Sequence, residues 1–165
     1  MEEMRVYIAN LGRYNEGELM GAWFTPPVDY DEMAERIGLD GCYEEYAIHD
    51  YELPFEIEEY ETIERVNDLC EMVSELDSDI QAELKELQSY FRNIEELCDH
   101  ADDIIPHFDC EDMEDVARQF IEESGALREV PEYLQNYIDY EAYGRDLELS
   151  GRFVVTNSGV FEITC

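Results

Sequence analysis

Two cysteines and two histidines, Cys98, His100, His107 and Cys110, are the residues whose types and proximity in the chain could hold a zinc ion. Zinc in proteins is bound chiefly by thiolates and imidazoles at characteristic spacings. The step from Cys98 to His100 is poor for one helix face, and no CxxC or HxxxH pair supports the set. We therefore interpret the four as ordinary core and polar residues and predict no metal and no cofactor.

A calcium loop is the second chemistry that the acidic residues could support. Asp77, Asp79 and Gln81 begin the alternating pattern of such a loop. Ala82 then follows at the position that needs glycine, and Gln88 stands where a glutamate is needed. The pattern predicts no specific loop, although a chain this acidic is expected to attract cations diffusely.

Catalytic residues are no easier to single out. Paired carboxylates occur everywhere among 44 acids, so their pairing indicates nothing. Ser158 lacks the GxSxG context of a hydrolase nucleophile. His49, inside an expected strand and beside Asp50, is better explained by a structural hydrogen bond than by a catalytic base. The sequence therefore predicts that the protein is not an enzyme.

The charge is the strongest signal in the chain. Forty-four acidic residues face ten basic ones, for a net charge of -34, yet 45% of the chain is hydrophobic. Such charge usually marks a disordered tail, but here enough apolar surface exists to fold. The sign excludes nucleic acid and anionic membrane as partners and favours basic protein surfaces.

Neither a membrane span nor a signal peptide is evident, so we expect a cytoplasmic protein. The five cysteines are then expected to be free thiols.

The patterning divides the chain at 1–61, 62–103 and 104–165. The first part is expected to be mixed α/β, with strands over 5–10, 19–24 and 43–52. Asp29 and Gly38 are placed to begin and end a helix between them.

The middle part is expected to be helical, because apolar residues from Ile63 to Leu76 recur with helical spacing. The pattern continues over 80–91 and 94–101 and suggests short antiparallel helices.

The last part is expected to hold helices and a closing hairpin. Asp109 with Asp112 would begin a helix that Gly125 ends, and Pro131 would open another. Residues 152–156 and 160–164 flank a turn and predict the hairpin. The fold class is therefore α+β, an elongated chain of three small subdomains.

An acidic stripe lies opposite the apolar face of the helix that starts at Ile63. Like charges one turn apart cost roughly 0.2–0.5 kcal/mol per pair, and the chain has only one lysine, Lys85. Stability alone would not select this pattern, which indicates an external partner. The acids expected to form the partner-binding surface are Glu64, Asp68, Glu71, Glu75, Asp79, Glu83, Glu86, Glu95, Asp99, Asp102, Glu111, Asp115 and Glu122.

The charge also matches the density of duplex DNA, which carries one charge per about 1.7 Å of axis. The net charge corresponds to roughly 58 Å of duplex, or about 17 base pairs. A chain drawn out as linked subdomains could present that length, whereas a compact sphere could not.

A second surface is expected near residue 135, where the apolar arc of a helix is wider than the roughly 100° needed for burial on one side. Such a helix lies either deep in its own domain or in a dimer seam, and tyrosine is common at interfaces. The residues expected at a homodimer interface are Tyr133, Leu134, Tyr137, Ile138 and Tyr140.

Three stretches carry a family resemblance: MRVYIANLGRYNEGELMGAWF at 4–24, EEYAIHDYE at 44–52 and YIDYEAYGRDL at 137–147. They resemble the ArdA antirestriction proteins of mobile elements such as conjugative transposons. The resemblance implies a dimeric, elongated mimic of B-form DNA that is not an enzyme. It also implies a partner, the DNA-binding groove of type I restriction–modification enzymes, and protection of incoming mobile DNA.

Two alternatives stay open from the residues. One is a halophilic protein whose acidity maintains solubility, which would unfold below molar salt. The other is a chaperone or buffer for basic proteins, which would not compete with a specific duplex.

Overall fold

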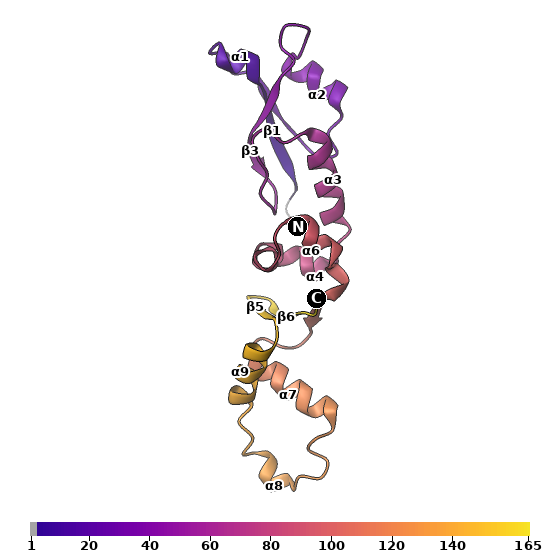
Figure 1. Cartoon of the computed structure of the whole chain (residues 1–165), viewed down its shortest axis with the longest axis vertical. Coiled ribbons are helices and arrows are strands. Elements are labelled where there is room, and N and C mark those ends of the chain that lie inside the picture. Colours follow the sequence, from indigo (N-terminus) through magenta and orange to yellow (C-terminus); the bar gives the residue numbers. More distant parts are fainter. Residues whose placement is uncertain (1–2) are drawn as a thin grey trace.

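The computed structural model describes residues 3–165 as a long, narrow column (Figure 1). One sheet with its helices occupies the N-terminal end, short helices form the middle, and a second sheet with three helices forms the other end. The predicted α+β class is confirmed. The strands are β1 (Arg5–Asn10), β2 (Gly21–Phe24), β3 (Tyr46–Glu52), β4 (Ile104–His107), β5 (Phe153–Thr156) and β6 (Gly159–Ile163). The helices are α1 (Leu11–Asn15), α2 (Tyr30–Ile37), α3 (Ile63–Ser74), α4 (Ser78–Ala82), α5 (Leu84–Leu87), α6 (Ile94–Asp99), α7 (Met113–Ser124), α8 (Glu132–Gln135) and α9 (Tyr140–Ser150), with short 3-10 turns η1 (Gln88–Tyr90) and η2 (Ala101–Asp103).

The N-terminal sheet is antiparallel in the order β2-β1-β3. Helix α2 has the predicted ends, because Asp29 accepts a hydrogen bond from the Glu32 N–H and Gly38 adopts the left-handed conformation. Strand β3 is shorter than predicted. The residues before it form a turn in which the Asp40 carboxylate accepts from the backbone N–H groups of Cys42 and Tyr43.

Helix α3 confirms the predicted periodicity. Thr62 accepts from the Arg65 N–H and begins the helix. The apolar face is buried, while Glu64, Asp68 and Glu71 on the opposite face are exposed.

The next stretch is not one helix, so the expectation of one continuous helix over 80–91 was wrong. Its side chains Ile80, Leu84 and Leu87 are buried as expected, but the backbone breaks at Glu83 into α4 and α5. The Gln81 amide, next to this break, donates to three carbonyl oxygens at and just beyond the end of α3.

The C-terminal sheet has the order β4-β6-β5 and contains the predicted hairpin. Helix α7 begins at Asp112 and ends at Gly125 as expected. Asp109 plays no part in the cap and instead has a positive φ of 63°. Strand β4 was not predicted, because Pro106 within it weakens the strand signal, although an edge strand tolerates proline.

The single wide apolar helix predicted near residue 135 was also wrong. Helix α8 is a single turn that ends at Gln135, and α9 starts afresh at Tyr140. Asp139 begins α9 by accepting from the Ala142 N–H. The residues between the two helices are therefore irregular.

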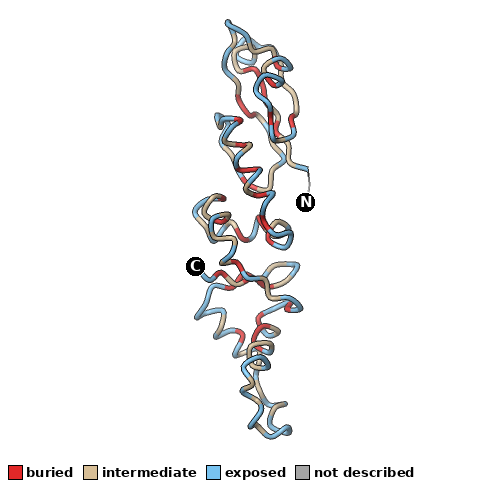
Figure 2. Tube along the Cα trace, turned by 90° about the vertical axis from the view of Figure 1, so that its right-hand side faces the viewer, coloured by how far each residue is buried: buried red, intermediate tan, exposed pale blue. Residues whose placement is uncertain are grey.

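Buried residues follow the axis of the column instead of gathering at one centre (Figure 2). One continuous cluster runs from the N-terminal sheet through α3–α6 to β4, β5 and β6. A smaller one joins α7 to the hairpin through Cys110, Met113, Val116, Phe153 and Val160. In the part of the chain that the structure describes, no helix is both long and apolar enough to cross a bilayer.

Gly144 sets how closely α7 and α9 approach each other. It is the buried residue of α9, and a Cβ atom at this position would overlap the backbone carbonyl of Met113. We expect Gly144→Ala to lower the free energy of unfolding by about 2–3 kcal/mol, because a backbone cannot yield as a flexible side chain can. Urea unfolding measures this. Gly41→Ala is the matched control, since its Cβ would meet no atom within 4 Å; equal effects at both positions would contradict the close-packing account.

Candidate partner-binding surface

The acidic residues lie on the outside along the whole column. Within residues 3–165 no acid is buried, and the half-buried ones are Glu61, Glu83, Glu95, Glu96, Asp103, Asp115 and Glu162. The single buried polar residue in this range is Asn10. The charge is therefore a surface property of a folded protein, and not of a tail.

Most of the predicted partner-binding acids point into solvent without an ion pair inside the described chain. These are Glu64, Asp68, Glu71, Glu75, Asp79, Glu86, Asp99, Asp102, Glu111 and Glu122. Helix α3 alone supplies Glu64, Asp68 and Glu71, and Glu75 follows directly at its C-terminal end.

Three acids of the predicted set are used by the protein's own fold. Glu95 on α6 pairs with Arg65 on α3, and this ion pair lowers the pKa of its carboxyl group. Glu83 accepts a hydrogen bond from the Ser158 hydroxyl, and Asp115 accepts from the Glu111 N–H. These three carboxylates are less available to a partner than the other ten.

Most of the few basic side chains form ion pairs with acids of the same chain. Six arginines form ion pairs: Arg5–Glu52, Arg13–Glu18, Arg65–Glu95, Arg92–Glu96, Arg118–Glu114 and Arg145–Glu141. The adjacent arginine lowers the pKa of Glu52 and of Glu96, so both are ionised at neutral pH. The exposed charged side chains that remain outside these pairs are mostly carboxylates.

Helix α3 is fixed at its first and second turns to strand β3 and to the loop between β2 and α2. The Tyr46 hydroxyl on β3 accepts from the Ile63 N–H at 3.1 Å. Asn67 makes two hydrogen bonds with the backbone of Val28, at 2.7 and 2.9 Å. Its acids therefore stand on an anchored helix, and their spacing is set by the fold.

The acidic surface extends beyond the residues selected from the sequence. Exposed acids also cover α2 and the turns of the N-terminal unit, and they continue on α9. Examples are Asp31, Glu32, Glu35, Glu44, Glu45, Asp146 and Glu148. The even spread of acids along the sequence was the signal that could have included them, whereas the search for helical stripes favoured the middle of the chain.

The residues expected at a dimer interface lie around α8, at the end of the column opposite the sheet β2-β1-β3 (Figure 1). Tyr137 is 84% exposed and Tyr133 70% exposed in the single chain, and Leu134 is exposed as well. Ile138 and Tyr140 are half-buried, and the Tyr140 ring stacks under the Arg118 guanidinium at 4.2 Å. Exposed aromatic and apolar side chains therefore accompany the exposed acids at this end.

The four possible zinc ligands considered from the sequence do not come together in the described residues. The His107 imidazole bonds to Glu162 at 2.9 Å and packs against Phe120 and Phe153. The Cys110 thiol contacts Gln119, and burial raises the pKa of the Cys98 thiol to about 11.

His49 occupies an extra position in β3 where the register with β1 shifts. Its ring lies edge-on to Tyr14 at 4.6 Å and 3.6 Å from the Glu59 carboxylate. Asp50 bonds to the Tyr51 N–H and not to His49.

A family model described as antirestriction protein (ArdA) matches residues 6–162, which is nearly the whole chain. No curated protein matched the chain in a sequence search. The matched region covers nearly all of both sheets, the acidic helix α3, and the segment around α8 with its exposed tyrosines.

Proposed function

Because this chain belongs to the ArdA family of antirestriction proteins, we propose that it inhibits type I restriction–modification enzymes by occupying their DNA-binding groove as a mimic of duplex DNA. In this role it protects incoming mobile DNA from restriction. The observation that carries the proposal is the set of exposed, uncompensated carboxylates distributed along a long, narrow fold.

Two physical features support mimicry over simple acidity. A groove that binds DNA is lined with cations spaced to meet phosphates along an axis, so an inhibitor must present anions along an axis too. The column and the anchored helix α3 meet that requirement at low cost in conformational entropy on binding.

A competition experiment tests the proposal. Labelled duplex carrying the recognition sequence of a type I enzyme is bound to the enzyme, and the protein is then added. We expect displacement of the duplex at micromolar protein or below, and weaker inhibition as the salt concentration rises, because the contacts are between charges. Unchanged DNA binding at micromolar protein would overturn the proposal.

Two controls separate the alternative functions. A buffer for basic proteins would bind hen lysozyme as strongly as the restriction enzyme, whereas a mimic should prefer the enzyme. A halophilic protein would unfold in dilute buffer, whereas circular dichroism of a mimic should give a folded spectrum there.

We also propose that two copies associate through the segment around α8, where Tyr133 and Tyr137 are exposed. Tyr137→Asp should shift the protein from dimer to monomer on sizing chromatography, because a charge would be desolvated at the seam. Tyr60→Asp is the matched control, since Tyr60 is 69% exposed but lies far from α8 in the chain. A dimer that survives Tyr137→Asp, or that is lost equally in the control, would contradict this interface.

A further inference from the structure

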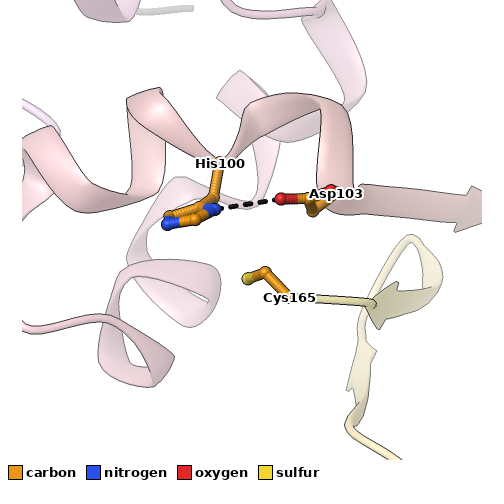
Figure 3. Close-up of side chains that lie close together, drawn as sticks. All are labelled: His100, Asp103 and Cys165. Carbon is orange, nitrogen blue, oxygen red and sulfur yellow. Dashed lines mark hydrogen bonds and ion pairs between the residues drawn. The ribbon is translucent and has the colours of Figure 1, made fainter.

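Three side chains with different metal-binding atoms meet near the middle of the column (Figure 3). The His100 Nδ1 lies 2.9 Å from the Asp103 Oδ2, and the Cys165 thiol lies beside them. One ligand atom from each residue falls within 4.8 Å of the others. Among the residues that the structure describes, no other group of three histidine, cysteine or acidic residues converges in this way.

The fold brings Cys165 to this place although it is more than sixty residues from its neighbours in the sequence. Strand pairing sets Ile104 against Ile163. Beyond the paired residues, Thr164 donates to the Asp103 carbonyl oxygen through its N–H at 2.8 Å and through its hydroxyl at 3.0 Å. These contacts fix the direction in which the next residue, Cys165, leaves the strand.

The histidine is held from the other side. Its backbone N–H donates to the carbonyl oxygens of Glu96 and Leu97 at the end of α6, and its ring stacks on Phe91 with an interplanar angle of 19°. His100 and Asp103 are half-buried and Cys165 is exposed, so an ion could reach the three ligands from solvent.

We propose that His100, Asp103 and Cys165 bind a divalent transition metal of the zinc class. A thiolate, an imidazole nitrogen and a carboxylate suit zinc and cobalt, whereas magnesium and calcium prefer oxygen ligands. Three protein ligands leave one position for water. On binding, the Cys165 thiol releases its proton to solvent, and where a protonated Nδ1 becomes the ligand its proton is released to solvent as well.

The surrounding negative charge favours cation binding at the site but does not select which metal binds. The net charge of -34 raises the local concentration of every divalent cation. Only a site with nitrogen and sulfur ligands can retain the zinc class against an excess of magnesium. A bound ion would tie the turn after α6 to the end of β6, and so close the chain across the middle of the column.

Cobalt titration of the full chain tests this proposal, in excess magnesium and with a reductant that lacks thiols. We expect a thiolate-to-cobalt absorption band in the near ultraviolet that saturates at one equivalent per chain. Zinc should abolish the band and should raise the melting temperature of the protein.

Two cysteine variants make the test specific. Cys165→Ser should lose the band and the zinc-dependent rise in melting temperature, while its melting temperature without metal should stay unchanged. Cys42→Ser should keep both, because Cys42 is exposed but belongs to no such cluster. His100→Gln should weaken cobalt binding at least tenfold.

Three results would overturn the site: no band in the unaltered protein, a band that persists in Cys165→Ser, or cobalt binding that magnesium displaces. The last would mean diffuse attraction of cations to an acidic surface. Because none of these measurements involves a restriction enzyme, failure of the metal site leaves the proposed inhibition untouched, and the converse also holds.

Discussion

Replacing Glu64, Asp68, Glu71 and Glu75 together by their amides is expected to weaken inhibition of a type I restriction enzyme by about two to three orders of magnitude. Each carboxylate lies on or just after α3, is exposed and has no ion pair in the described chain. A charge contact at about 4 Å contributes roughly 1 kcal/mol even at the dielectric constant of water. The measurement is the inhibitor concentration that displaces half of a bound duplex.

The control for this variant removes the same charge from acids that the protein already uses. Glu18, Glu52, Glu114 and Glu141 each form an ion pair with an arginine of the same chain. Changing these four to glutamine alters the net charge equally but should weaken inhibition far less. Equal losses in the two variants would mean that total charge alone matters, and that α3 is not a contact surface.

The α3 variant should nevertheless stay folded and lose no stability. Like charges at Glu71 and Glu75, near the negative end of the helix dipole, each cost a few tenths of a kcal/mol. Glu64 at the first turn and Asp68 near Arg65 act in the opposite sense. The net change in the free energy of unfolding should therefore lie between zero and about 1 kcal/mol of stabilisation. Lost inhibition with retained stability would separate a functional role from a structural one.

Asn10→Asp is expected to have the largest effect on stability, a loss of about 3–5 kcal/mol. The Asn10 amide nitrogen donates to the carbonyl oxygens of Ile37 and Gly38, each at 3.1 Å, and its oxygen accepts from the Arg13 N–H. The side chain is completely buried. An aspartate would place a buried negative oxygen against two carbonyl oxygens and leave both without a donor.

Urea unfolding at neutral pH measures this loss, and Asn15→Asp is the matched control. Asn15 is exposed at the end of α1, so the same atoms change without desolvation. The control also accounts for adding one more charge to an acidic protein. If both variants lost the same stability, general repulsion would explain the result and the buried network around Asn10 would not.

Local signals in the sequence predicted the elements that are bounded by their own residues. Asp29 with Gly38 and Asp112 with Gly125 mark the ends of α2 and α7, and the spacing from Ile63 gives the buried face of α3. Each of these features depends on residues within a few positions of one another. The sequence therefore contains the information in a form that periodicity and capping rules can extract.

The wrong predictions share a different physical origin. The Gln81 amide bonds to the end of the preceding helix and accompanies a break that the apolar pattern does not reveal. Gln135 donates to the carbonyls of Leu127 and Val130, next to the stretch where a longer helix was expected. Hydrogen bonds from a side chain to backbone groups five to eight residues away leave no periodic trace in the sequence.

For the candidate surface too, local sequence signals predicted some features, and tertiary contacts determined the others. Periodicity placed Glu64, Asp68 and Glu71 on an exposed face, as the structure has them. Nothing local indicated that Glu95 would pair with Arg65 across two helices, or that Cys165 would lie beside His100. Both juxtapositions arise from tertiary contacts between segments far apart in the chain.

The thin core along the axis has an electrostatic consequence of its own. Packed around a single centre, the same carboxylates would all lie within a short radius, and their mutual self-energy would oppose folding. Along a column, the same carboxylates lie farther apart on average than around a single centre. Screening, with a length of about 8 Å at physiological ionic strength, then removes more of their mutual repulsion. The drawn-out shape thus allows a polyanion to remain folded with very little lysine or arginine to neutralise it.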